Sequence, residues 1–166
     1  MLPKIPATGD TILVLFIEPQ EPGYTFERKR LEWPLHITLI PWFRVPDPST
    51  LDGILETVAV QSRPFDAVVG MEAAFGGRKE VLVNVLADPA LAQHLHLNLK
   101  RALDGVGANY QSERFTGDNY KPHITHHGDR RRHEGDRLAV RNFYLVKLLP
   151  QNYCQVVKAY ELGYNS

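Results

Sequence analysis

The tripeptide His-Ile-Thr occurs twice in the chain, at residues 36–38 and at residues 123–125. An aromatic residue precedes each histidine by three positions, Trp33 in the first copy and Tyr120 in the second. One copy of so short a motif would be weak support for a function, because such motifs also arise by chance. Two identical copies in matching contexts are therefore the strongest chemical signal in this sequence.

Both copies are predicted to lie on β-strands, in which successive side chains point to opposite faces. His36 then shares a face with Thr38, and His123 shares a face with Thr125. The isoleucine inside each tripeptide points the other way, into the core. If the two strands lie side by side, or in facing sheets, the two His/Thr pairs converge on one cleft.

Two imidazoles that face one ligand can act as an acid–base pair, because the unperturbed pKa of histidine, about 6.5, lies near neutrality. One neutral ring can take a proton from water while a charged ring protonates the departing oxygen, and each role contributes roughly 10²–10⁴ in rate. Threonine hydroxyls can donate to phosphoryl oxygens and hold the phosphorus between the rings, without a metal. We predict that His36 and His123 are catalytic, with either ring as the acid, and that Thr38 and Thr125 bind the phosphate.

Three neighbours of the repeat are further candidates for contacting the substrate. His127 follows Thr125 by two positions and so shares the face of His123, where it would bind the phosphate or a base. Trp42 and Phe43 lie just beyond the first copy. They either stack on a nucleobase or pack at the end of the strand.

A metal-dependent hydrolase is one alternative, with His123, His126 and His127 as ligands and His133 or Asp129 completing the site. On a strand, however, His126 would point away from the other two histidines, which weakens this alternative. A second alternative is a non-catalytic RNA-binding module, which would bind RNA ends without hydrolysing them.

Two helices are predicted, each after an Asp-Pro pair. Asp47 and Asp88 each supply a capping carboxylate, and the proline that follows has no N–H to lose in the first turn. Apolar residues then recur at helical spacing over 51–58 and 91–103. In the second helix His94 and His96 lie about 200° apart, so they cannot chelate one ion together and are predicted to be surface or helix-packing residues.

Strands account for much of the remaining chain. The candidates, rich in β-branched and aromatic residues, are 12–17, 35–40, 65–73, 81–86, 122–127, 138–148 and 153–162. The glycines at the start of 76–79 predict a hairpin turn. Because neighbouring strands are often joined by turns too short for parallel crossovers, the sequence predicts an α+β fold with largely antiparallel sheets and helices on one face of each.

Two charged segments show no regular pattern. Residues 128–136 contain Arg130, Arg131 and Arg132, within a stretch to residue 141 in which five arginines face three acidic residues. They form either a solvated loop or a lip that attracts phosphate. Residues 21–32 show no helical stripe and are predicted to be a loop or a short helix.

The sequence resembles the 2H phosphoesterase superfamily, and within it the bacterial RNA 2′,3′-cyclic phosphodiesterase and 2′-5′ RNA ligase-like group. The signature of this family is two His-x-Thr/Ser motifs, which match 36–39 and 120–125, the second with its customary preceding proline, Pro122. The resemblance extends over the hairpin at 65–83, the helix at 91–103 and the closing strand pair at 138–162.

This resemblance implies a two-lobed α+β fold in which two antiparallel sheets, backed by helices, enclose a central cleft that holds both motifs. It also implies hydrolysis or reversible formation of 2′,3′-cyclic phosphate or 2′-5′ phosphodiester bonds, at RNA ends or in small cyclic nucleotides. In such enzymes the paired histidines act as acid and base, with no metal and no organic cofactor. The chain is therefore expected to be a cyclic phosphodiesterase.

The balance of acidic and basic residues limits the kinds of partner that this chain is expected to bind. Among its 166 residues, 19 Lys and Arg residues match 19 Asp and Glu residues. A protein that binds along a nucleic-acid strand normally carries a basic excess. We therefore expect a small cyclic nucleotide or an RNA end as the substrate, and no long nucleic-acid track.

The composition and the length of the apolar runs indicate which class of protein this is. A content of 43% hydrophobic and 23% charged residues is typical of a globular protein, so we expect one domain over residues 1–166, in a monomer. The longest apolar run, 12–17, is too short to cross a bilayer and lacks the flanks of a secretory signal, which predicts a cytoplasmic protein without membrane contact. The lone cysteine, Cys154, is expected to be a packed or half-exposed thiol and not a nucleophile.

Overall fold

Ten strands of the protein join edge to edge in this computed structural model, which describes residues 10–163. In spatial order they run β2-β10-β9-β1-β3-β7-β5-β4-β8, and β6 pairs with β3 off this path. Every strand pair is antiparallel, which confirms the predicted α+β class. The strands are β1 (Thr11–Phe16), β2 (Thr25–Glu27), β3 (His36–Arg44), β4 (Phe65–Phe75), β5 (Val81–Leu86), β6 (Asn109–Tyr110), β7 (His123–Thr125), β8 (Arg137–Val140), β9 (Asn142–Leu149) and β10 (Tyr153–Glu161).

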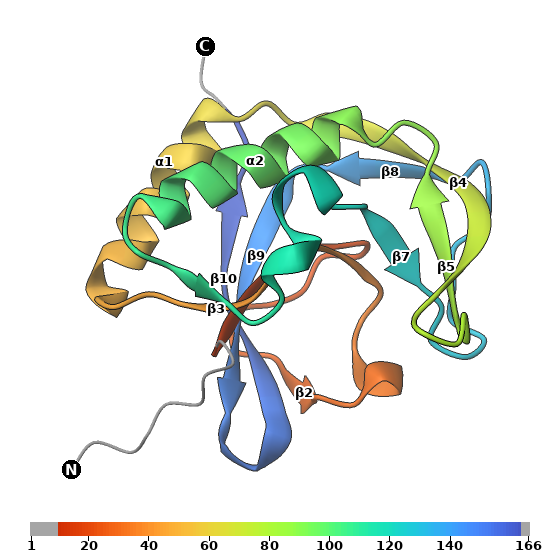
Figure 1. Ribbon diagram of the computed structural model, residues 1–166, viewed down its shortest axis with the longest axis horizontal. Coiled ribbons are helices and arrows are strands. Elements are labelled where there is room, and N and C mark those ends of the chain that lie inside the picture. The colour runs from red at the N-terminus through yellow and green to blue at the C-terminus, as the bar shows by residue number, and fades with distance from the viewer. Residues whose placement is uncertain (1–9, 164–166) are drawn as a thin grey trace.

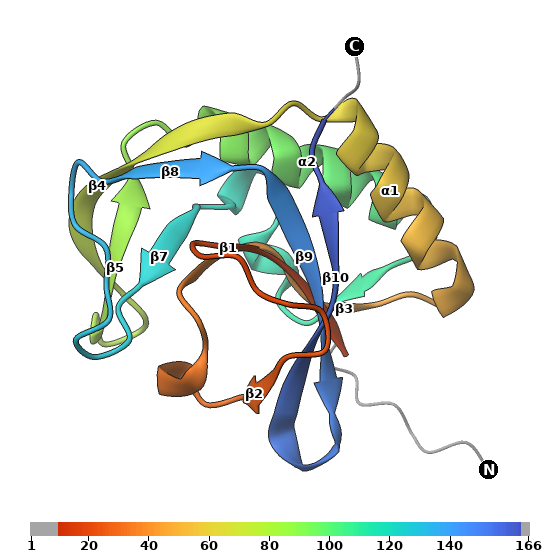
Figure 2. The same ribbon diagram turned by 180° about the vertical axis from the view of Figure 1, so that it is seen from behind.

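The two sheets implied by the family resemblance are two halves of this one order, which meet between β3 and β7 (Figures 1 and 2). The β3–β7 ladder registers at Ile37 and Ile124 alone, whereas all three residues of β7 pair with β5. Longer ladders hold each half together, as between β1 and β3 or between β4 and β5. The join between the halves is therefore narrow.

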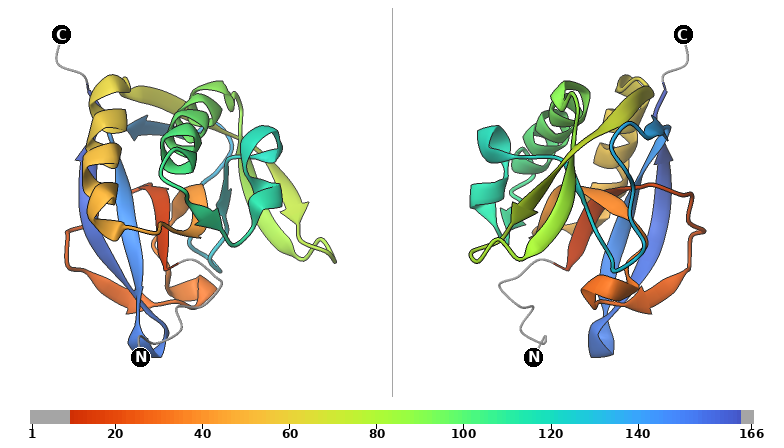
Figure 3. Two further views of the ribbon diagram at one scale, coloured as in Figure 1. Left: turned by 60° about the vertical axis from the view of Figure 1, so that its left-hand side comes forward. Right: turned by 90° about the vertical axis from the view of Figure 1, so that its right-hand side faces the viewer.

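Both helices lie side by side on the same side of the molecule (Figure 3). Helix α1 (Leu51–Gln61) packs on β10, and α2 (Ala90–Asp104) packs on β3. Both Asp-Pro pairs stand at the predicted helix starts. Asp47 caps the 3₁₀ turn Pro48–Thr50 that leads into α1, accepting from the Ser49 N–H at 3.1 Å, and Asp88 accepts from the Ala90 N–H at 3.0 Å. We expected a helix on one face of each sheet; instead one helix pair covers a core to which both halves contribute.

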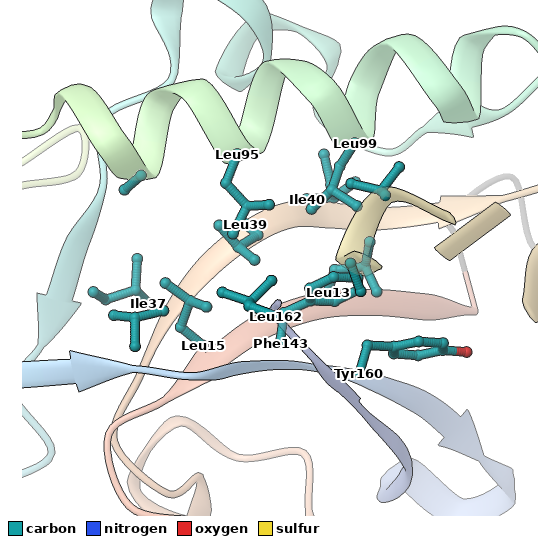
Figure 4. Close-up of a cluster of buried hydrophobic side chains, with 14 of the residues drawn as sticks. Leu13, Leu15, Ile37, Leu39, Ile40, Leu95, Leu99, Phe143, Tyr160 and Leu162 are labelled. Atoms are coloured by element: carbon teal, nitrogen blue, oxygen red, sulfur yellow. The ribbon is translucent and has the colours of Figure 1, made fainter. Parts of the chain in front are cut away.

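The strands around β1 are covered on both faces. Leu13 and Leu15 point into the main core under the helices, where they meet residues such as Leu39 and Phe143 (Figure 4). The alternate residues of β1 point into a second cluster, which consists of Ile12, Val14, Phe26, Trp33, Tyr144, Val146, Cys154 and Val156. Burial on both faces explains why this strand is apolar without a break. Cys154 is fully buried, and burial raises the pKa of its thiol to about 11, which confirms a packed thiol.

Some boundaries differ from the sequence prediction. The predicted strand 138–148 is two strands, β8 and β9, with Arg141 between them. Strand β7 ends at Thr125. After it, the buried His126 ring bonds to the Asn84 side chain, and His127 forms an isolated β-bridge with Arg130. The sequence did not predict β2 or β6, which are too short to show a pattern. Of the helices within residues 10–163, none combines the length and the apolar character needed to span a membrane.

Candidate active site

The pairing of β3 with β7 places the two His-Ile-Thr copies side by side on adjacent strands. With Ile37 opposite Ile124, an antiparallel register sets His36 across from Thr125, and Thr38 across from His123. The two isoleucines are 1% and 0% exposed and fill the core, while the four polar side chains lie on the other face and stay partly exposed. The predicted convergence of the two pairs is therefore what the fold produces.

Two adjoining grooves open over these residues and share Thr38 and Pro41. The first, about 400 Å³ and here called the tryptophan groove, is lined by Ile12, Arg28, Arg30, Trp33, His36, Thr38, Pro41, Trp42, Val81, Thr125 and His127. The second, about 920 Å³ and here called the phenylalanine groove, is lined by Thr38, Pro41, Ala74, Phe75, Gly76, Gly77, Lys79, Phe115, Asn119, Tyr120, Lys121 and His123. All five predicted site residues line one groove or the other, and Thr38 stands between them.

Each motif histidine is oriented by the carbonyl two residues before it. His36 Nδ1 donates to the Pro34 carbonyl at 2.9 Å, and His123 Nδ1 donates to the Lys121 carbonyl at 2.7 Å. A carbonyl can only accept, so the partners fix the proton on Nδ1 in both rings. Nε2 is left as the basic nitrogen of each neutral ring, the same in both copies.

Burial favours the neutral form of both rings. It lowers the pKa of His36 to about 4, and the nearby His127 and His123 lower this pKa further, while the Pro34 carbonyl opposes the shift. Burial also lowers the pKa of His123 below its ordinary value, against the effect of the Lys121 carbonyl. At neutral pH His36 is therefore unprotonated, the form that a general base requires.

His127 lines the tryptophan groove beside His36, whereas His123 lines the phenylalanine groove. His127 Nδ1 donates to the Trp33 carbonyl at 2.7 Å, and its ring centroid lies 6.0 Å from that of His36. Arg130 donates to the same carbonyl at 3.1 Å and to the Leu31 carbonyl at 2.5 Å. These bonds fasten the loop that carries Trp33 beside the second motif.

His126 is turned away from the site. It is buried, and its Nε2 donates to Asn84 Oδ1 at 2.7 Å, while Asn84 Nδ2 donates to the Gly70 carbonyl at 2.9 Å. The side-chain amide of Asn84 thus provides a hydrogen-bond partner for the buried ring of His126. Nowhere in residues 10–163 do three or more His, Cys, Asp or Glu side chains gather so that they could hold a metal ion, so the geometry does not support the His123/His126/His127 alternative.

The arginines of 130–132 are engaged by the protein itself. Arg130 donates to the carbonyls of Leu31 and Trp33. Arg131 pairs with Glu72 at 2.7 Å, and Arg132 lies 3.6 Å from Glu18. None of them lines either groove, but all three line a third groove of about 630 Å³, together with Glu18 and Glu32. The loop 128–136 is therefore held by contacts within the protein, and it also forms one wall of this third groove.

Other residues line the grooves that sequence reasoning did not single out. Arg28 and Arg30 come from the charged segment 21–32, and the Arg28 guanidinium lies 4.9 Å over the ring of Trp42. Phe75 packs edge-on against the ring of His123 at 4.7 Å. The sequence signal that could have pointed to Arg28 and Arg30 is the cluster of basic residues just before Trp33. Phe43, a stacking candidate, is instead fully buried in the core.

Comparison with known proteins agrees with this geometry. The fold is shared by solved structures over nearly the whole chain. A family model described as the 2′-5′ RNA ligase superfamily matches residues 17–139. The chain belongs to this superfamily, whose activity is phosphoesterase-like or ligase-like, and the resemblance noted in the sequence is confirmed. No curated protein sequence matches the chain.

Solved structures share the fold at low sequence identity. TT0787 of Thermus thermophilus is 17% identical with a TM-score of 0.58, over 92% of this chain and 97% of that one. E. coli LigT complexed with 3′-AMP is 14% identical with a TM-score of 0.60, over 95% of this chain and 99% of that one. E. coli LigT complexed with phosphate is 15% identical with a TM-score of 0.55, over the same shares of the two chains.

Proposed function

We propose that this protein is a metal-independent phosphoesterase that opens 2′,3′-cyclic phosphates at RNA ends or in small cyclic nucleotides, or reversibly forms 2′-5′ bonds. The observation that carries the proposal is the pairing of the two His-Ile-Thr strands, which faces two identically oriented imidazoles and two hydroxyls toward adjoining grooves. Two such pairs fit one phosphodiester, with a hydroxyl and a ring on either side.

We assign His36 as the base and His123 as the acid of hydrolysis. His36 Nε2 takes a proton from water while the water oxygen bonds to phosphorus. The bond from phosphorus to one ribose oxygen breaks, and His123 Nε2 gives its proton to that oxygen. Thr38 and Thr125 donate to the non-bridging oxygens, where negative charge grows. In the ligation direction the two histidines exchange roles.

The grooves suit a nucleoside on either side of the phosphate. Trp33 and Trp42 offer aromatic surfaces beside the cations Arg28 and Arg30, and Phe75 offers another surface beside His123. Aromatic faces stack on bases without regard to sequence, and arginine attracts further phosphates. E. coli LigT, whose fold this chain shares, is complexed with 3′-AMP in one solved structure and with phosphate in another.

The experiment is a screen of 2′,3′-cyclic mononucleotides, oligoribonucleotides with a cyclic end, and ADP-ribose 1″,2″-cyclic phosphate, each with and without a strong chelator. We expect turnover that persists with the chelator and disappears in His123→Ala. Activity lost together with a bound metal would instead support a metal-dependent hydrolase. Binding of RNA ends without turnover of any cyclic phosphate would support a binding module.

A further inference from the structure

The aromatic residues that precede the two motifs make different contacts. Trp33 packs on the ring of its own histidine, His36, with centroids 4.7 Å apart, and its Nε1 donates to the Arg28 carbonyl. Tyr120 stands at the matching position of the second motif but reaches across to the first. Its hydroxyl donates to the Thr38 carbonyl at 2.8 Å.

Tyr120 is held by a fully buried histidine of α2. The ring of His96 stacks on that of Tyr120, with centroids 4.0 Å apart and planes 10° apart. His96 Nδ1 donates to the Leu39 carbonyl at 2.6 Å, and Nε2 accepts from the Gly117 N–H at 2.9 Å. A carbonyl can only accept and an N–H can only donate, so these partners require the neutral ring in one tautomer.

These contacts join the two motifs outside the sheet. The carbonyls of Thr38 and Leu39 belong to the first motif strand, whereas Gly117 and Tyr120 belong to the segment that leads into His123. The strands themselves register at one residue pair, Ile37 with Ile124. So short a ladder fixes the distance between the motifs poorly, and the added bonds constrain it.

Neither side chain is placed to do the chemistry. Tyr120 lines the phenylalanine groove, but its hydroxyl is committed to a backbone carbonyl and the residue is only 5% exposed. Both nitrogens of His96 are committed to the backbone, and His96 lines neither groove. Their effect on the reaction would have to pass through the residues that they hold.

We propose that Tyr120 and His96 are a positioning pair that sets the separation of the His36/Thr38 motif from the His123/Thr125 motif. This inference rests on the proposed function, because the separation matters only if both motifs act on one phosphate. Misplacement of catalytic groups by about 1 Å can cost roughly 10²-fold in rate. The pair is therefore expected to govern kcat more than substrate binding.

The test compares Tyr120→Phe with Tyr160→Phe. Each variant removes one hydroxyl from a buried tyrosine, and the Tyr160 hydroxyl bonds to Asp52, whose helix α1 contributes to neither groove. With a 2′,3′-cyclic nucleotide we expect Tyr120→Phe to lower kcat about 10- to 100-fold while KM changes less than about threefold. Tyr160→Phe should keep kcat, although both variants lose one hydrogen bond of stability. Equal kcat in the two variants would overturn the proposal.

A second readout does not depend on turnover. Because Tyr120→Phe keeps the aromatic ring, changes in the imidazole NMR signals of His36 and His123 report displacement of the motifs. We expect both signals to shift in Tyr120→Phe and neither in Tyr160→Phe; signals that superpose on the wild type would refute the role. A wild type that hydrolyses none of the screened substrates would refute the proposed function alone, and this NMR comparison would still decide the positioning role.

Discussion

One ring nitrogen of each histidine in and around the site is committed to a hydrogen bond. His36, His123 and His127 donate from Nδ1 to backbone carbonyls, whereas His126 donates from Nε2 to the Asn84 side chain. The first three keep Nε2 as their basic nitrogen, and they are the three that line the grooves. His126, with the opposite tautomer, is structural. Hydrogen-bond partners therefore distinguish the three groove histidines from His126, which the alternation of side chains along a strand also predicts to point away.

Removing either motif imidazole should abolish turnover. We expect His36→Ala and His123→Ala each to lower kcat by roughly 10²–10⁴-fold, the usual contribution of a general acid or base. The matched control is His94→Ala, because His94 is an exposed histidine on α2 and lines neither groove. Steady-state kinetics on a cyclic mononucleotide give the result. Near wild-type kcat in either motif variant would refute the assignment.

The pH dependence should be displaced to the acid side of an ordinary histidine pair. His36 must be neutral and His123 charged, and the pKa of His36 is about 4 while that of His123 lies below 6.5. Activity then falls below about pH 4 as His36 gains a proton, and falls again as pH rises through the lowered pKa of His123. Since kcat/KM reports the free enzyme, its profile against pH should peak between about 4 and 6.5. A maximum above pH 7 would contradict this prediction.

At the scale of elements, the β4–β5 hairpin supports the second motif through a close backbone approach. The register slips between Val69 and Glu72, where Gly70 faces β5 so closely that a Cβ would lie 2.9 Å from both Ala87 N and Val85 O. The Gly70 carbonyl also accepts from Asn84, which holds His126 behind the motif strand. A glycine here therefore permits the close approach of β4 to β5, the strand that in turn pairs with β7.

Alanine at two glycines should change stability in opposite directions. Gly70→Ala should destabilise the protein by about 1–3 kcal/mol, because the methyl group meets backbone that cannot move aside. Gly53→Ala, the control, should stabilise it by up to about 1 kcal/mol, because Gly53 lies in α1 with nothing within 4 Å of the added Cβ. Denaturant unfolding of both variants measures the two values. A Gly70→Ala variant as stable as the wild type would refute the close approach.

Elements with strong local signals were predictable from the sequence. The Asp-Pro pairs marked both helix starts, because capping depends on neighbouring residues only. The break at Arg141 between β8 and β9 was missed, since apolar residues lie on both sides of Arg141 and Asn142 and only tertiary pairing separates the strands. Likewise the repeat predicted the face of each motif histidine, whereas Arg28 and Phe75 reach the grooves through folding of distant segments.

At the scale of the whole molecule, two apolar clusters lie on the two faces of the strands around β1. The second cluster connects the deep interior to the site, because it contains Cys154 as well as Trp33, which packs on His36. Packing on this face therefore supports the wall of the tryptophan groove.

The buried thiol offers a measurement of this packing. We expect Cys154 in the folded protein to resist a thiol reagent such as DTNB at neutral pH, because it is fully buried and its pKa is raised to about 11. The denatured protein, as the control, should react with one equivalent, since the chain has one cysteine. Modification of the native protein at the rate of the denatured one would show that the second cluster opens readily.

The hydrogen bond from each motif histidine to the carbonyl two residues earlier has a consequence for how such enzymes arise. Because His36 and His123 each carry their orienting group within the same short peptide, a copy of that peptide brings its own tautomer control wherever it is inserted. The scaffold then has to supply only two adjacent antiparallel strands at the correct spacing. Duplication of one such peptide is a short evolutionary route to a two-histidine catalyst, and grafting it twice onto an inert sheet is a direct route for enzyme design.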